Sequence, residues 1–251
     1  MSIPILYKYF PPERISFFEN RLVRFTQPSR FNDPFEFLPY EEFVPDVTVD
    51  DFDNFIYQKA TDCTISEEIQ RERLRNIKME FAAELQEFMV GTYDNLGVFC
   101  LSEEWDNILM WSHYASNHKG FVIGFNTEHP FFKNYEFELK SIDYSNKRPS
   151  SSVKDDYIKN LIYTKADVWR YEKEWRICRD LLQADKVIDQ DVYLFEIPID
   201  AIVCVYLGAK MSEEDKRNVT SETISWQSIP SAYQVHMHSR SYQLTPTPLD
   251  M

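Results

Sequence analysis

Glycine is scarce in this sequence, with 5 residues among 251. Glycine-rich phosphate loops need backbone at positive φ and a close approach of the backbone to the phosphate. Neither a GxGxxG nor a GxxxxGKS/T pattern occurs in the chain. We therefore expect no glycine-rich phosphate-binding loop.

Cysteine is also rare, and the four cysteines lie far apart without a CxxC pair. Cys100, Cys178 and Cys204 fall in apolar, strand-like runs, where a buried free thiol is the expected state. We therefore expect no metal site and a cytoplasmic location, in which thiols stay reduced. The N-terminus lacks an export-signal pattern and no run of eighteen apolar residues occurs, so we expect no membrane segment.

Basic residues are outnumbered, because 27 Lys and Arg stand against 41 Asp and Glu, a formal net charge of −14. A general nucleic-acid binder or a polybasic membrane-surface protein has the opposite balance. What the chain has in quantity is apolar and aromatic material, 43% and 16% of its residues. This composition predicts a folded protein with a large core, in which a local basic pocket remains possible.

Apolar runs and turn residues alternate along the chain without repeats or long linkers, which predicts a single domain over residues 1–251 with a helical insertion at about 45–92. From nine candidate runs we expect about seven or eight strands, with about four helices in mixed order. This is an α+β class with a mixed or split β-sheet. The runs are 3–9, 21–25, 96–101, 120–125, 137–144, 175–179, 192–197, 202–207 and 233–239, and the helices are 64–91, 103–115, 151–168 and 212–221.

The run Phe31–Glu36 (FNDPFE) has strong turn chemistry. Asn and Asp side chains cap local backbone groups, and the residue before proline is pushed out of the α region. One interpretation is a rigid turn held by two phenylalanines. The other is a turn that points Asn32 or Asp33 into a cleft.

A compact helix over 103–115 is predicted to begin at Ser102 as its N-cap. One face of this helix carries Ile108, Trp111 and Ala115, and the other carries Asp106, Met110, His113 and Tyr114. We expect the first face in the core and the second in a small-molecule site. His113 is then either a proton donor and acceptor or a structural hydrogen-bonding residue. Lys119 follows in a loop where a ligand phosphate could be met.

The run Trp169–Arg176 (WRYEKEWR) mixes rings with charges. In a strand, Glu172, Glu174 and Arg176 would share one face. They would either blunt an edge strand or form a site in which Arg176 holds one carboxylate and leaves the other free for a substrate hydroxyl.

Five motifs together resemble the bacterial family catalogued as domain of unknown function 2971. They span most of the chain in order: LYKY at 6–9, FNDPFE at 31–36, the LMWSHYA and NHKGFVIGF segments within 109–125, YEKEWR at 171–176 and VYLGAK at 205–210. The resemblance names no reaction.

The order of a first strand with a basic residue between aromatic ones, a central strand followed by an aromatic-bearing helix, and a late strand with a glutamate also resembles the ADP-ribosyltransferase superfamily. That resemblance implies NAD bound in a cleft of a split β-sheet. Lys8 would stand where the superfamily has Arg or His, Trp111 or Tyr114 would stack on nicotinamide, and Glu174 would contact the ribose, with Glu172 beside it. The NAD-binding residues expected are Tyr7, Lys8, Tyr9, Asn32, Asp33, Ser102, Trp111, Tyr114, Lys119 and Arg176.

The function expected from this resemblance is an ADP-ribosyltransferase or NAD glycohydrolase, such as a toxin or a phage-defence effector. Glu174, Glu172 and His113 would be its catalytic residues, NAD its nucleotide substrate, and a protein or nucleic acid its acceptor. A carboxylate near the ribose would stabilise the oxocarbenium-like state in which the nicotinamide bond breaks. Two alternatives stay open: a non-catalytic nucleotide sensor or interaction module, and a metal-independent hydrolase or nuclease that uses His113 with the glutamates.

Overall fold

A computed structural model describes residues 5–37, 95–133, 137–149, 157–189, 191–224, 226 and 231–249. The predicted helical insertion at 45–92 lies outside these residues, as does Cys63. The prediction of a single domain therefore stays a prediction. No helix within the described ranges is long and apolar enough to cross a membrane.

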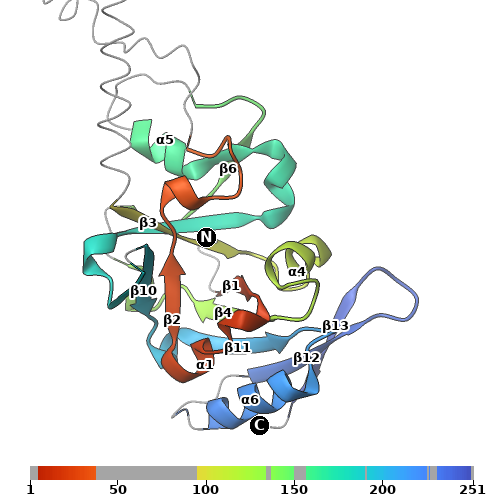
Figure 1. The fold of residues 1–251 in the computed structure, drawn as a ribbon. Coiled ribbons are helices and arrows are strands. Elements are labelled where there is room, and N and C mark those ends of the chain that lie inside the picture. The colour runs from red at the N-terminus through yellow and green to blue at the C-terminus, as the bar shows by residue number, and fades with distance from the viewer. Residues whose placement is uncertain are drawn as a thin grey trace, which may run out of the picture.

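The main element is an eight-stranded sheet in the order β13-β12-β11-β4-β1-β3-β8-β5 (Figure 1). Its strands are β1 Ile5–Phe10, β3 Leu96–Ser102, β4 Phe121–Asn126, β5 Lys140–Ser141, β8 Glu174–Asp180, β11 Ile202–Leu207, β12 Ser231–Met237 and β13 Leu244–Pro248. Only β11 and β12 run parallel, and the other neighbours are antiparallel. The predicted α+β class with a mixed sheet is confirmed.

Two smaller sheets accompany the main one. The first contains β2 (Leu22–Phe25), β10 (Val192–Glu196) and β9 (Lys186–Ile188), and the second pairs β6 (Asp143–Ser145) with β7 (Thr164–Ala166). The strands β7, β9 and β13 were not expected from the sequence, and the run 137–144 forms parts of two short strands instead of one long strand.

The helices are short and lie around the sheet (Figure 1). They are α1 Phe17–Asn20, α4 Ile108–Tyr114, α5 Tyr157–Tyr163 and α6 Glu213–Ile224, with 3-10 turns η1 Pro12–Arg14, η2 Pro28–Arg30, η3 Pro130–Phe132, η4 Asp167–Glu172, η5 Leu181–Gln183 and η6 Ile199–Ala201. The helix predicted at 103–115 begins only at Ile108, because Asn107 caps it. The helix predicted at 151–168 ends at Tyr163, where β7 follows.

The core is built mainly from phenylalanine rings. Phe10 stacks on both Phe17 and Phe121, with ring centroids 5.3 and 5.1 Å apart, and Phe25 stacks on Phe99 at 5.2 Å. All five rings are buried. Burial of so much apolar area is the main stabilising contribution expected for this fold. The tyrosines of β1, Tyr7 and Tyr9, lie outside this phenylalanine cluster.

The sheet opens between β1 and β3. β1 pairs with β4 along its whole length and β3 pairs with β8 along its whole length, but β1 and β3 share the single register pair Tyr7 and Ser102. Ser102 also pairs with Glu174 on the far side, so Tyr7, Ser102 and Glu174 form one row across three strands. The pairing between β1 and β3 is thus interrupted directly beside Glu174, the glutamate of the late strand β8.

β13 is the last strand at one end of the eight-stranded sheet. It pairs with β12 from Leu244 to Pro248 and contains a second proline at Pro246. Proline lacks a backbone N–H, so it is tolerated in strands mainly at edges. The β12–β13 hairpin extends outward from the rest of the sheet (Figure 1).

Candidate functional site

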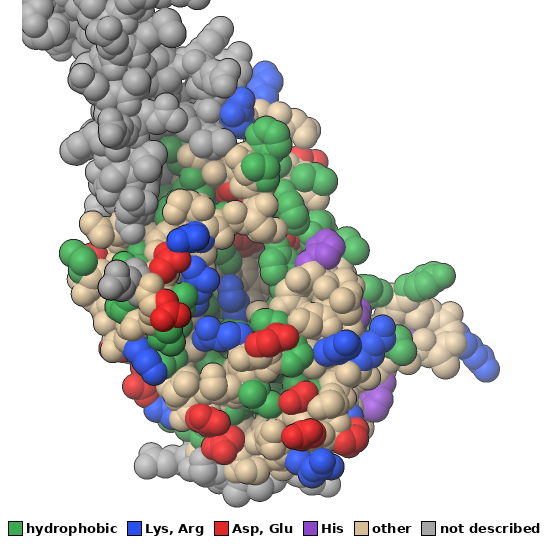
Figure 2. All heavy atoms as spheres, in the orientation of Figure 1, with side chains coloured by type: hydrophobic (Ala, Val, Ile, Leu, Met, Phe, Trp, Pro, Cys, Tyr) green, Lys and Arg blue, Asp and Glu red, His purple; other side chains and the backbone are tan. Residues whose placement is uncertain are grey.

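A pocket of about 360 Å³ lies at the opening between β1 and β3. β1 contributes Tyr7, Lys8 and Tyr9 to its wall, and β3 contributes Cys100 and Ser102. The remaining wall comes from η2 and the following loop, from α4, and from the segment between β7 and β8. Figure 2 shows basic side chains around a hollow on this face of the molecule. The volume falls in the range of small-molecule sites.

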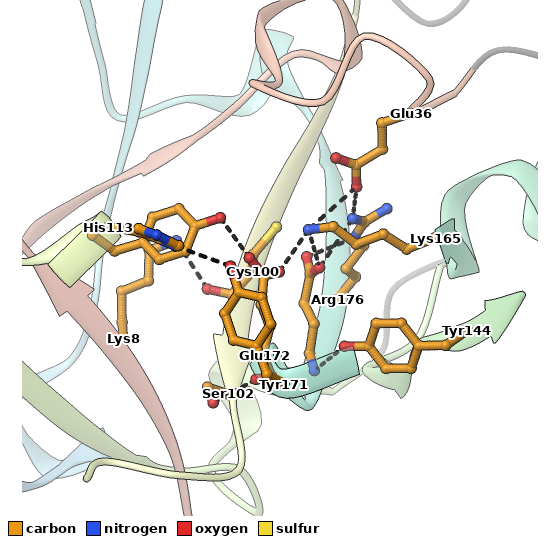
Figure 3. Close-up of polar contacts among 12 residues, drawn as sticks. Lys8, Glu36, Cys100, Ser102, His113, Tyr144, Lys165, Tyr171, Glu172 and Arg176 are labelled. Carbon is orange, nitrogen blue, oxygen red and sulfur yellow. Dashed lines mark hydrogen bonds and ion pairs between the residues drawn. The ribbon is translucent and has the colours of Figure 1, made fainter. Parts of the chain in front are cut away.

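Lys165 on β7 lies at the centre of a buried ionic network that forms part of the pocket wall. Its Nζ is 2.6 Å from Glu172 Oε2 and 2.9 Å from Glu174 Oε2, and it lies 3.8 Å from Glu36 Oε1. Figure 3 shows the lysine reaching from one side into this group of carboxylates. One ammonium group therefore ties together two segments of the chain, the turn after η2 and the η4–β8 junction.

Arg176 is the second cation of the network. Its Nε donates to Glu174 Oε1 at 2.7 Å, one of its terminal nitrogens forms an ion pair with Glu36, and the other donates to the Ile162 carbonyl at 2.7 Å. The side chain has no exposed surface. Arg176 is not among the residues that line the pocket, which does not fit its prediction as an NAD-binding residue.

Burial sets the protonation behaviour of this network. None of its five side chains is more than 4% exposed. Burial raises the pKa of Glu174, with Lys165 opposing and Glu172 adding to the rise. Burial alone would lower the pKa of Lys165, but the carboxylates of Glu174 and Glu172 more than offset it, so its pKa is raised. Charges buried this deeply are tolerated only when paired.

The region around Glu172 differs from its predicted strand geometry. Glu172 ends η4, Lys173 adopts a left-handed conformation with φ of 43°, and β8 begins only at Glu174. The expectation of one free carboxylate is wrong, because Tyr114 donates to Glu172 Oε1 at 2.6 Å while Lys165 binds Oε2. The edge-strand alternative is wrong as well, since β8 lies between β3 and β5.

Lys8 faces the pocket from β1. Its Nζ donates to the Cys100 carbonyl at 2.9 Å, across the opening in the sheet, and lies 5.1 Å from the centroid of the Phe99 ring. Burial lowers the pKa of Lys8, although Glu174 and Glu172 act in the opposite direction. Lys8 is thus a cation held beside the carboxylate network without a direct ion pair to any described residue.

Ser102 and α4 are arranged differently from the prediction. Ser102 is the last residue of β3; its hydroxyl donates to the Glu172 carbonyl at 2.7 Å and lines the pocket. Asn107 caps α4 instead, since its Oδ1 accepts from the backbone N–H groups of Leu109 and Met110. The predicted helix faces are partly exchanged, because Met110 is buried and Ile108 is 38% exposed.

The three candidate ring residues of α4 have separate environments. Tyr114 and His113 line the pocket, and His113 Nδ1 lies 2.9 Å from the Tyr171 hydroxyl near the surface. Trp111 is fully buried, donates from Nε1 to the Trp105 carbonyl at 2.7 Å and packs edge-on against Tyr9. Its predicted role as a plate for the ligand does not fit this placement.

The FNDPFE turn divides its two polar residues. Asn32 lines the pocket together with Tyr114. Asp33 is buried and its Oδ1 accepts from the Phe35 N–H at 2.9 Å, which is the turn-capping role. Lys119 is exposed in the loop before β4 and does not line the pocket. Of the predicted nucleotide contacts, Asn32 is thus brought to the pocket, while Asp33 and Lys119 are not.

Sequence reasoning missed Lys165 and Glu36 as residues of the site. Arg30 lines the pocket and also pairs with Asp191 at 2.5 Å. Glu36 belongs to the FNDPFE motif, which is interpreted from the sequence as a turn. Lys165 belongs to residues 151–168, which are predicted to be helical. No spacing pattern marks an isolated lysine of this kind. Among the described residues, no group of three or more His, Cys, Asp or Glu side chains is placed to hold a metal ion.

A comparison with protein-family models finds a similarity over part of this site. The family model described as protein of unknown function (DUF2971) matches residues 110–177, the stretch that runs from α4 into β8. No curated protein and no solved structure matches the chain. The predicted resemblance to ADP-ribosyltransferases is therefore not shown by these comparisons. From Met110 to Ile177, which includes His113, Tyr114, Lys165, Glu172 and Glu174, the chain is similar to the DUF2971 family of unknown function.

Proposed function

We propose that the pocket binds a nicotinamide nucleotide and that the protein is an ADP-ribosyltransferase-like enzyme, acting as a transferase or an NAD glycohydrolase. One observation carries the proposal. Tyrosine rings, cations and a pair of carboxylates line one pocket at an opening of the sheet, beside a late-strand glutamate. A dinucleotide needs these three kinds of contact for its rings, its pyrophosphate and its ribose hydroxyls.

The distribution of charge supports this ligand class. Glu172 and Glu174 line one part of the pocket, and their carboxylates suit a positively charged group such as the nicotinamide ring. Lys8 and Arg30 lie on other parts of the wall and suit the pyrophosphate. No glycine-rich loop is needed for this mode of binding, which agrees with the scarcity of glycine. The overall negative charge is tolerable because the positive potential is local.

The chemistry required is cleavage of the bond between nicotinamide and ribose. The electron pair of that bond leaves with nicotinamide, and the ribose carbon gains oxocarbenium character. A Glu174 or Glu172 oxygen that accepts a hydrogen bond from a ribose hydroxyl would stabilise this charge. Water would then complete a glycohydrolase reaction, and a nucleophile on a protein or nucleic acid would complete a transfer. Tyr114, fixed by its bond to Glu172, is the ring best placed to orient the nicotinamide.

A second candidate, a non-catalytic nucleotide sensor or interaction module, is favoured by a different observation. Every carboxylate oxygen of Glu172 and Glu174 already accepts a hydrogen bond from a side chain. A carboxylate engaged in this way can fix the shape of a pocket without taking part in a reaction. Both candidates require the same ligand, so binding and turnover must be measured separately.

The test is incubation of the purified protein with NAD, with nicotinamide release followed by chromatography and NAD binding followed by calorimetry. Glu174→Gln is the informative variant, and Glu128→Gln, at an exposed position outside the pocket, is the matched control. Circular dichroism shows whether each variant is folded. The enzyme proposal expects release by the parent protein and by Glu128→Gln, and at least a 100-fold slower rate in folded Glu174→Gln, the order of loss seen when one such stabilising group is removed.

Two further outcomes separate the candidates. Binding of NAD without nicotinamide release, and without transfer of label from radiolabelled NAD to any lysate component, overturns the enzyme and supports the sensor. Absence of both binding and release overturns both. Expression in a bacterial host adds a cellular measurement, because a transferase toxin slows growth and its Glu174→Gln form does not.

A further inference from the structure

Lys8 is unusual among the charged residues of the pocket because its hydrogen-bond partner is neutral. Its Nζ donates to the Cys100 carbonyl, and no ion pair joins it to any residue in the described part of the chain. By contrast, Lys165 bonds two carboxylates and Arg30 bonds Asp191. An ammonium group has three donors, so two remain unused by described residues. The Lys8 amine can therefore react with a ligand in the pocket, whereas Lys165 and Arg30 are held by carboxylates.

We propose that Lys8 is an imine-forming residue, whose Nζ condenses with the aldehyde or ketone of a small anionic ligand held in this pocket. This assignment does not depend on the proposed function, because it needs neither NAD nor Glu174 catalysis of glycosidic cleavage. The assignment rests on the Lys8 amine and on the residues that line the pocket around it. Tyr7 and Tyr9 flank the lysine on the same strand, and Arg30 lies on the pocket wall as a partner for a phosphate or carboxylate.

The environment of the Lys8 amine makes its neutral, nucleophilic form more accessible than desolvation-free surroundings would. Burial lowers the pKa of Lys8, and Arg14 adds to the lowering, whereas Cys100, Glu174 and Glu172 oppose it. A lysine whose ammonium form is destabilised by desolvation is activated for attack on carbonyl groups. Lys133, which follows η3, is exposed instead.

The reaction balances without an oxidant or a reductant. The lone pair of Nζ forms a bond to the carbonyl carbon, and the carbonyl oxygen takes up a proton to give a carbinolamine. Both hydrogens of the neutral amine finally leave with that oxygen as water, and a carbon–nitrogen double bond remains. Glu174, which lines the same pocket and has a raised pKa, is suited to carry protons between nitrogen and oxygen.

The test uses pyridoxal 5′-phosphate as the probe, since it joins an aldehyde, an aromatic ring and a phosphate. The full chain is incubated with one equivalent of the probe, imine formation is followed by absorbance, and borohydride reduction fixes the label for peptide mapping. Lys8→Arg retains the charge but cannot form the imine, and Lys133→Arg is the matched surface control. We expect Lys8 to hold most of the label, at least tenfold more than Lys133 within the same sample, and Lys8→Arg to lose it.

The comparison of Lys8 with Lys133 inside the parent protein keeps the test valid even where Lys8→Arg fails to fold. Label spread evenly over exposed lysines, or equal labelling of the parent protein and folded Lys8→Arg, overturns the proposal. Excess inorganic phosphate as competitor distinguishes anchoring by the phosphate group from capture by the aldehyde alone. Nicotinamide release is measured on separate samples, so failure of the imine and failure of NAD cleavage are independent results.

Discussion

Arg176 and Glu36, 140 positions apart in the chain, form an ion pair in which neither side chain has any exposed surface. The pair joins the FNDPFE turn to β8 and thereby links two walls of the pocket region. Its contribution is conformational more than energetic, because the desolvation of two charges offsets much of their attraction. The pair is costly to break, however, since Arg176 would lose one of its two carboxylate partners, and Glu36 alone would keep only the more distant Lys165.

Loss of this pair should be severe. Glu36→Ala is expected to lower the free energy of unfolding by about 3–5 kcal/mol, the cost typical of removing one partner from a buried pair. Urea denaturation followed by tryptophan fluorescence measures the change. Glu19→Ala, at an exposed position on α1, should change stability by less than about 0.5 kcal/mol. A similar small effect in Glu36→Ala would show that the network rearranges around Arg176 without cost.

Glu174 should impose a pH dependence on stability. Because its pKa is raised in the folded protein, the native state binds more protons than the unfolded chain above the ordinary glutamate pKa of about 4.3. Its contribution to the free energy of unfolding therefore falls as pH rises from that value through the raised pKa. Urea denaturation at a series of pH values, from about 4.5 to 8, would record this slope.

Glu174→Gln removes the titrating group and provides the reference for that experiment. The difference in unfolding free energy between the parent protein and Glu174→Gln should shift in favour of the variant as pH increases. Glu128→Gln, at an exposed site, is the control for the same substitution outside the network. Parallel curves for the parent protein and Glu174→Gln would contradict the raised pKa.

Trp111 should matter for stability and not for ligand contact. It is fully buried, and its indole N–H is satisfied by a backbone carbonyl. Trp111→Ala is expected to cost about 3–5 kcal/mol through lost burial and the cavity left behind. The milder Trp111→Phe should lower the midpoint of thermal unfolding while NAD affinity, measured well below that midpoint, changes less than about twofold. A large loss of affinity in stable, folded Trp111→Phe would restore the indole as a ligand contact.

The described cysteines should resist alkylation in the folded protein. Burial raises the pKa of Cys178 to about 12 and that of Cys204 to about 11, and it raises the pKa of Cys100 as well. The thiolate is the reactive form, so iodoacetamide at neutral pH should modify these three only slowly. Mass mapping before and after unfolding in urea measures the protection. Rapid modification of Cys100 in the native state would show that its thiolate is stabilised within the pocket.

Much of the fold could be predicted because its strands obey simple local rules. The runs that became β3, β4 and β11 are short and continuously apolar, which is typical of strands covered on both faces. β9 and β13 escaped prediction for equally local reasons. β9 is three residues long and has no buried residue, and β13 contains two prolines, a residue that normally interrupts a strand.

The site was predictable in its members more than in its geometry. Glu172, Glu174 and Tyr114 were expected, and the structure brings them together with Lys8 and Ser102. The sequence could not indicate that Lys173 takes a left-handed conformation, which ends η4 and turns the chain into β8. The left-handed conformation of Lys173 sets the direction of the Glu172 side chain. A lysine at this position does not predict such a conformation.

Lys165 illustrates a different limit. Its role depends on contacts with Glu172 and Glu174, which lie seven and nine residues further along the chain, on the far side of a 3-10 turn. Periodicity relates residues within one element, so it carries no information about a lysine that reaches across a turn. Trp111 shows the converse, because helix periodicity correctly predicted it in the core, whereas the resemblance to ADP-ribosyltransferases predicted it as a ligand contact.

The two prolines of β13 have a consequence for how the protein behaves towards its own copies. Residues 244, 246 and 248 alternate with positions whose backbone groups bond β12, so the prolines stand where the N–H would point away from the sheet. The outer rim of this strand thus offers carbonyl acceptors but lacks donors at two successive outward positions. A strand added at this edge would find no N–H donor at the two proline positions. The proline rings therefore prevent further strands from extending the sheet into a polymer at this edge.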